Sequence, residues 1–114
     1  MSQAVHVAEI ALEPDSLAPE QVVAGDPQVR ARVLHTSADG RVERGVWEIT
    51  PGVVTDVEAD ELFVVVAGRA TIEIEGGDTL EVGPGDAVVL EEGARTRWTV
   101  HETLRKVYQV TDHG

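Results

Sequence analysis

The chain has 114 residues, an apolar fraction of 42% and no cysteine. It therefore has the length of one domain, and a disulfide framework, a thiolate nucleophile and a zinc–thiolate site are excluded. Its 21 acidic and 9 basic residues give a formal net charge of −12, which argues against nucleic acids and anionic membranes as partners. Because no apolar stretch has the length of a membrane span and the N-terminus lacks a secretory pattern, we expect a cytoplasmic protein.

Residues 1–28 are predicted to form an N-terminal arm rather than part of the main fold. Several prolines and Gly25 interrupt every longer pattern in this segment. Within it we expect one strand around Val5–Leu12 and a short helical turn that opens with Ser16 as its cap. The sequence leaves open whether the arm packs on the rest of the chain or on a second subunit.

Residues 29–114 are predicted to form an all-β domain. Apolar and polar residues alternate in Val29–His35 and again in Ala70–Glu75, which is typical of half-buried strands. Turn signals separate about eight or nine short strands, the spacing expected for a sandwich or a barrel. We expect Gly68 to close one of these strands and a hairpin at about Glu102–Thr103 to separate two others.

Two stretches punctuated by glycine carry a family signature. In the first, Glu61 is followed after six residues by Gly68. In the second, Gly83-Pro-Gly-Asp86 opens a strand that Gly93 closes. This pair of half-motifs, in this order, resembles the cupin superfamily.

Two further stretches, Gly45–Gly52 and Trp98–Tyr108, narrow the resemblance. They are similar to the branch that contains the ethanolamine-utilisation cupins and the (S)-ureidoglycine aminohydrolase domains. The resemblance covers roughly residues 29–111 and implies a small double-stranded β-helix, which is the jelly-roll-like barrel of cupins. It implies a homodimer as well, but it does not identify a function, because one barrel supports many chemistries.

The same resemblance shows that the usual metal ligands are mostly missing. Metal-binding cupins supply a His-x-His pair, a glutamate and a third histidine. Here only the glutamate position is filled, by Glu61, whereas the histidine positions fall within residues 54–57 and at Thr96. One carboxylate holds a transition metal poorly, because affinity comes from several ligands at fixed geometry. We therefore predict no metal cofactor, with Mn, Fe, Ni or Zn bound partly by Glu61 as the alternative.

Other possible ligands are interpreted as surface groups. Carboxylates suit Mg, Ca or Mn, but we interpret the cluster of Glu58, Asp60 and Glu61 as an acidic, solvated loop at the barrel mouth. Strand parity nevertheless favours Glu61 facing the cavity. The histidines lack the spacing of a metal site, and His113 is expected to be disordered at the C-terminus. They are His6, His35, His101 and His113.

A set of side chains is predicted to face the barrel cavity and bind a ligand. Strand parity points Thr96 and Trp98 inward together. On the last strand, either Lys106 and Tyr108 or the residues that alternate with them face the cavity. An inward Lys106 and Tyr108 suit an acidic or carbonyl-bearing ligand, whereas the alternative places Lys106 at the surface and Tyr108 in the core. The candidates are Trp47, Glu61, Phe63, Thr96, Trp98, Lys106 and Tyr108.

Two functional hypotheses follow. In the first, the protein binds a small polar or anionic metabolite in its barrel without the usual histidine-based metal site, as a sensor, a carrier or a cofactor-free catalyst. In the second, it is a metal-dependent, aminohydrolase-like enzyme acting on a nitrogen-containing or organic-acid metabolite, with Glu61, Lys106 and Tyr108 around the substrate. A structural subunit is a third option. The sequence does not decide whether the protein is an enzyme.

Overall fold

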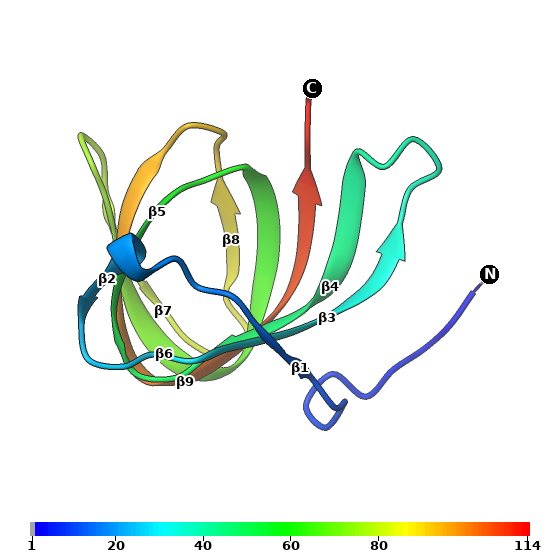
Figure 1. Cartoon of the computed structure of the whole chain (residues 1–114), viewed down its shortest axis with the longest axis horizontal. Coiled ribbons are helices and arrows are strands. Elements are labelled where there is room, and N and C mark those ends of the chain that lie inside the picture. Colours follow the sequence, from blue (N-terminus) through cyan, green and yellow to red (C-terminus); the bar gives the residue numbers. More distant parts are fainter. Residues whose placement is uncertain (1) are drawn as a thin grey trace.

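The computed structural model describes residues 2–114 and consists almost entirely of antiparallel strands (Figure 1). The predicted all-β barrel is confirmed. A short 3-10 turn, η1 (Pro19–Gln21), lies between the first two strands, and no helix in the described chain is long and apolar enough to span a membrane. The strands are β1 (Glu13–Asp15), β2 (Val22–Ala24), β3 (Val29–Thr36), β4 (Val42–Ile49), β5 (Gly52–Val57), β6 (Asp60–Ile74), β7 (Thr79–Val82), β8 (Ala87–Leu90) and β9 (Arg95–Thr111).

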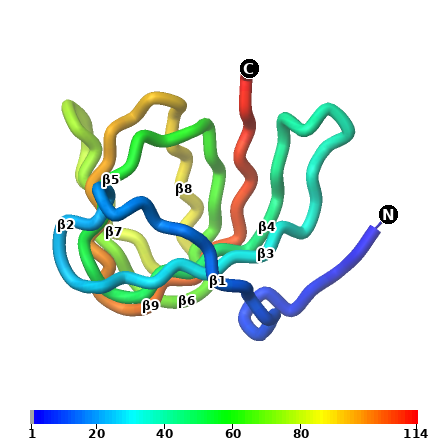
Figure 2. Tube along the Cα trace, viewed as in Figure 1, coloured from blue at the N-terminus to red at the C-terminus, as the bar shows by residue number. Residues whose placement is uncertain are grey.

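Two long strands, β6 and β9, organise the barrel. They pair with each other along almost their whole length, and their register shifts between Val65 and Ala70. In the trace of Figure 2 the middle parts of both strands lie together at one end of the barrel, and their ends rise on two sides. Residues 95–100 of β9 also pair with β5, whereas residues 104–111 pair with β4. The two halves of β9 therefore belong to different walls of the barrel.

Two predicted strand breaks are wrong. Gly68 and the segment Glu102–Thr103 are expected to interrupt strands, but β6 and β9 continue through both points. A Cβ atom at Gly68 would lie 2.1 Å from the carbonyl oxygen of Thr103. The glycine therefore lets the two bent strands approach each other, because it has no side chain. A bend inside a strand pair produces the same local sequence signal as a turn between strands.

The N-terminal segment also differs from its prediction. The stretch Val5–Leu12 forms no strand but contains a turn, in which the amide of Ile10 donates to the carbonyl of His6 at 2.9 Å. Strand β1 begins after it and pairs with β3, and β2 pairs with β5. The predicted helical turn begins later than Ser16, at Pro19, because proline is already set for a first helical position.

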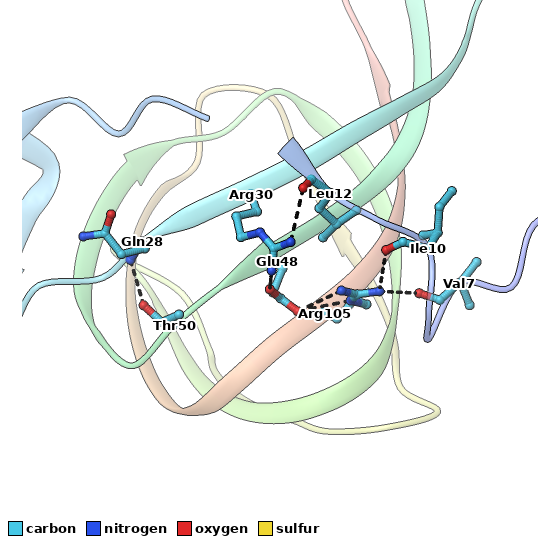
Figure 3. Close-up of polar contacts among 8 residues, drawn as sticks. All are labelled: Val7, Ile10, Leu12, Gln28, Arg30, Glu48, Thr50 and Arg105. Atoms are coloured by element: carbon cyan, nitrogen blue, oxygen red, sulfur yellow. Dashed lines mark hydrogen bonds and ion pairs between the residues drawn. The ribbon is translucent and has the colours of Figure 1, made fainter. Parts of the chain in front are cut away.

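Arg105, on the outer face of β9, anchors the arm on this chain's own barrel (Figure 3). Its guanidinium donates to the carbonyl oxygens of Val7 at 3.0 Å and Ile10 at 3.2 Å. The same group pairs with Glu48 at 3.1 Å. Arg30, which also pairs with Glu48, donates to a third arm carbonyl at 3.2 Å. The arm is thus held through its backbone, and of the two options left open it packs on the barrel.

The core lies between the walls of the barrel. It is apolar over most of its extent but contains polar and charged side chains at the candidate site. Most of its side chains are aliphatic, with Ile49, Ile72 and Leu104 fully enclosed. Four buried residues are polar or charged, which is unusual for a small core. They are Glu58, Glu61, Thr96 and Lys106.

Gly68→Ala is expected to destabilise the fold more than Gly76→Ala. Both glycines have left-handed φ angles, +83° and +72°, so alanine costs about 1–2 kcal/mol at either position. Only at Gly68 does the added Cβ meet backbone atoms, since nothing lies within 4 Å at Gly76. Urea unfolding should show an additional loss of about 1–3 kcal/mol for Gly68→Ala. Equal losses would contradict the close approach of β6 and β9.

Candidate functional site

A cavity of about 390 Å³ opens among the side chains that face the barrel interior. Five of the seven predicted site residues line it, and they are Trp47, Glu61, Trp98, Lys106 and Tyr108. The other two, Phe63 and Thr96, are buried against these residues. A wider groove of about 780 Å³ runs past η1 and the β6–β7 turn, and its lining is mostly exposed and polar. The smaller cavity is the candidate site because its walls carry buried charged and aromatic groups.

Strand register explains why Lys106 and Tyr108 point inward. Lys106 lies in one row with Trp47 of β4 and Val65 of β6, and Tyr108 lies in the next inward row with Phe63. Lys106 is 6% exposed and Tyr108 is 8% exposed. Of the two parities left open by the sequence, the structure therefore has Lys106 and Tyr108 facing the interior.

Lys106 is the only lysine of the chain, and its ammonium group is enclosed in the cavity wall. Its Nζ donates to Oε2 of Glu61 at 2.7 Å. The same atom lies 4.3 to 5.0 Å from the ring centroids of Trp47, Phe63 and Trp98, which we call the aromatic cage. A buried charge is tolerated when it is paired, and the ring faces attract cations further. The site is therefore built to hold a positive charge.

Glu58 is a site residue whose environment the sequence analysis misassigned. Its side chain does not lie in a solvated loop, since the residue is 6% exposed. Its Oε2 accepts hydrogen bonds from Oγ1 of Thr96 at 2.6 Å and from Nε1 of Trp98 at 3.2 Å. The interpretation is wrong because two inward-facing donors on β9 hydrogen-bond the Glu58 carboxylate and hold it inside the barrel. The sequence feature that could have indicated a buried carboxylate was the pair of inward-facing donors Thr96 and Trp98, to which no acceptor was assigned.

Burial changes the acidity of two carboxyl groups at the cavity. Burial raises the pKa of Glu58 above its ordinary value of 4.5, and the negative charges of Asp56 and Glu61 add to the rise. The hydrogen bond from Thr96 opposes this effect. Burial likewise raises the pKa of Asp56 above 3.8, although the Lys106 charge lowers it. These two groups consequently take up protons at a higher pH than carboxylates with ordinary pKa values do.

Tyr108 serves as a hydrogen-bond donor in the site. Its hydroxyl donates to Oε2 of Glu43 at 2.7 Å. Burial and this bond to Glu43 raise the pKa of Tyr108 well above its ordinary value of 10, so the phenol remains protonated at neutral pH. The ring passes over Gly45, where an added Cβ would lie 2.7 Å from the tyrosine oxygen. The same Cβ would lie 2.6 Å from the carbonyl oxygen of Arg32, so the two contacts together explain the glycine in the Gly45–Gly52 motif.

A family model for EutQ-like cupin domains matches residues 36–108. The chain belongs to the EutQ-like cupin family. This result confirms the branch of cupins predicted from the sequence. None of the curated proteins searched matches the chain significantly.

Similar solved structures agree with the assignment of this chain to the cupin family. A DUF861-family protein of unknown function from Pseudomonas syringae is 31% identical, with a TM-score of 0.81 over 90% of this chain. This chain covers only 45% of that protein, so it spans less than half of the relative's length. The EutQ protein of Clostridium difficile is 20% identical, with a TM-score of 0.65 over 75% of this chain and 69% of EutQ. At that identity the likeness shows the fold alone.

The donor set in this EutQ-like cupin does not fit the histidine-based metal site of its superfamily. Glu61, the one expected ligand, is engaged by Lys106. Within residues 2–114, a single trio of possible ligand atoms lies within 4.8 Å of one another, and it is outside the cavity. The trio consists of Asp60, Glu92 and His113.

The histidines lie at the surface, as expected. One expectation about them is wrong: His113 is not disordered, because it pairs with the carboxylate of Asp60. His35 contacts Arg44, and His101 contacts Thr71. None of the four lines the cavity.

A double-mutant cycle tests the buried ion pair. Lys106→Met leaves the Glu61 carboxylate buried without its partner, so we expect a loss of about 3–5 kcal/mol. Glu61→Gln likewise leaves the Lys106 ammonium buried without a charged partner. The double variant should lose less than the sum of the single losses, because no unpaired charge remains. Urea unfolding of the four proteins measures this coupling.

The exposed pair Arg69–Glu102 is a matched control for this cycle. Its side chains are 59% and 60% exposed and 3.5 Å apart, so Arg69→Met and Glu102→Gln should show a coupling of about 0–1 kcal/mol. If the losses at Lys106 and Glu61 are as additive as those of the control, the buried pair is contradicted.

Proposed function

We propose that this cupin binds a small organic cation, an amine in its ammonium form, in the barrel cavity and without a metal. The proposal rests on the charges of the cavity lining. Among the described residues of that lining, five are carboxylates and one is basic. The basic residue, Lys106, is already paired with Glu61. The carboxylates are Asp15, Glu43, Asp56, Glu58 and Glu61.

This proposal changes the ligand expected from the sequence. An anionic metabolite would need Lys106 as its receptor. To reach that ammonium it would have to displace Glu61 and then lie among the remaining carboxylates, which repel it. A cationic ligand would instead meet unpaired carboxylate oxygens. Hydrogen bonds between an ammonium and a carboxylate are stronger than those between neutral groups.

The aromatic groups and the size of the cavity support the same ligand. The rings of Trp47 and Trp98 lie 6.0 Å apart between centroids, and both line the cavity. Their faces attract ammonium groups, as they do that of Lys106. A volume of about 390 Å³ is in the range of small-molecule sites.

The metal-dependent enzyme has less support. It needs several ligands at fixed geometry, and the cavity offers carboxylates without a trio in coordination distance among the described residues. An enzyme without a metal would use Glu58, whose raised pKa suits proton transfer. The homodimer and the cytoplasmic location stay predictions.

Calorimetric titration tests the proposal. We expect n-butylamine to bind at neutral pH and acetate to give no heat of binding. Glu58→Gln removes the charge but keeps an acceptor for Thr96 and Trp98, so amine affinity should fall about ten-fold. Because Glu58 must be ionised, binding by the unmutated protein should weaken as the pH falls through its raised pKa. An exposed glutamate would lose its charge only at lower pH.

Two controls make this result decisive. Glu102→Gln removes one negative charge from the exposed surface and should leave amine affinity unchanged. Elemental analysis after incubation with Mn, Fe, Ni and Zn salts and desalting should find no stoichiometric metal. A retained metal, or tighter binding of acetate than of the amine, would overturn the proposal in favour of the metal-dependent or anion-binding alternative.

A further inference from the structure

The unpaired carboxylates of the cavity form two groups. Asp56, which pairs with Thr96 of β9, and Glu58 form one group beside β5. Glu43, which pairs with Val110 near the other end of β9, belongs to the second group beside β4. Because the two halves of β9 belong to different walls, the groups lie on different sides of the cavity.

The charges that act on Glu58 and on Tyr108 agree with this division. The carboxylates that raise the pKa of Glu58 are Asp56 and Glu61, whereas those that raise the pKa of Tyr108 are Glu43, Glu61 and Asp15. Only Glu61 is common to both sets. We call Asp56 and Glu58 the β5 group, and Glu43 on β4 is the carboxylate of the second group. Glu61 lies opposite Val110, in the same row as Glu43.

Each group keeps oxygens for a ligand. Glu58 accepts its hydrogen bonds on Oε2 and Glu43 on Oε2, which leaves Oε1 of each without a partner in the described structure. Asp56 likewise uses only Oδ1. No fully buried side-chain oxygen or nitrogen in the described residues lacks a partner, so the free oxygens of Glu58 and Glu43 are accessible, and both residues line the cavity together with the exposed Asp56. Glu58 itself is more than nine-tenths buried.

Lys106 shows which chemistry this environment accepts. Its ammonium is bound by one carboxylate and three rings, so its single charge is hydrogen-bonded to Glu61 rather than to Asp56, Glu58 or Glu43. One added ammonium would compensate one group and leave the other uncompensated. Two ammonium groups joined by a short hydrocarbon chain would compensate both, with the chain against Trp47 and Trp98.

We infer that the ligand of this cavity is a linear diamine, with one ammonium bound by Asp56 and Glu58 and the other by Glu43. The inference rests on the proposed function and adds the ligand class. A hydrated divalent ion is a poorer occupant, because it needs several oxygens around one point, and the described carboxylates of the cavity do not converge in that way.

Matched pairs of amines test the inference by calorimetric titration. We expect putrescine to bind about ten-fold or more tightly than n-butylamine, and cadaverine to exceed n-pentylamine similarly, because the second ammonium gains its own charged hydrogen bonds. The β5 group, which contains the buried Glu58, should hold the single ammonium of a monoamine. Glu43→Gln, which still accepts from Tyr108, should therefore lower diamine affinity toward the monoamine value and lower monoamine affinity much less.

Two comparisons keep the test decisive. Asp15→Asn removes an exposed carboxylate of the cavity lining whose charge acts on Tyr108, the donor to Glu43, so it should also lower diamine affinity more than monoamine affinity if Glu43→Gln proves unstable. Glu102→Gln should alter neither amine. Equal affinities for diamines and monoamines, or equal weakening of both by Glu43→Gln, would overturn the inference while leaving the proposed function intact. Failure of every amine to bind would overturn both.

Discussion

The positive charge of a buried ammonium group must be balanced by the groups around it. This requirement determines which side chains surround Lys106 inside the barrel. Lys106 meets it through Glu61 at 2.7 Å and through the aromatic cage. The partners come from β4, β6 and β9, so Lys106 connects three strands of the barrel. Removing one partner leaves a charge that burial makes costly. The pair therefore connects the packing of the strands with the charge of the cavity.

The paths of β6 and β9 place these groups together. Each strand runs through two walls, and Gly68 permits their close approach where they bend. One half of β9 presents Thr96 and Trp98, which draw Glu58 inward, and the other half presents Lys106 and Tyr108. Because the only lysine is paired, the remaining carboxylates give the cavity a negative character. That character favours a cationic ligand over the anionic one suggested by an inward lysine and tyrosine.

Sequence patterns predicted the fold well because its signals are local. Alternation in Val29–His35 and the glycine turns depend on neighbouring residues, and the inward parity of Thr96 and Trp98 follows from the strand itself. The partners could not be predicted in this way. Lys106 and Glu61 are 45 residues apart, and Thr96 and Glu58 are 38 apart. Their contacts depend on where the long strands bend.

The ammonium signal of Lys106 in a proton–nitrogen correlation NMR spectrum tests the buried Lys106–Glu61 ion pair most directly. Since the chain contains one lysine, the side-chain signal needs no assignment among several lysines. The account predicts a slowly exchanging ammonium resonance at neutral pH, shifted by the surrounding rings and lost or strongly moved in Glu61→Gln. A fast-exchanging signal like that of a free lysine, unaffected by Glu61→Gln, would contradict the enclosed ion pair on which the cavity's proposed chemistry depends.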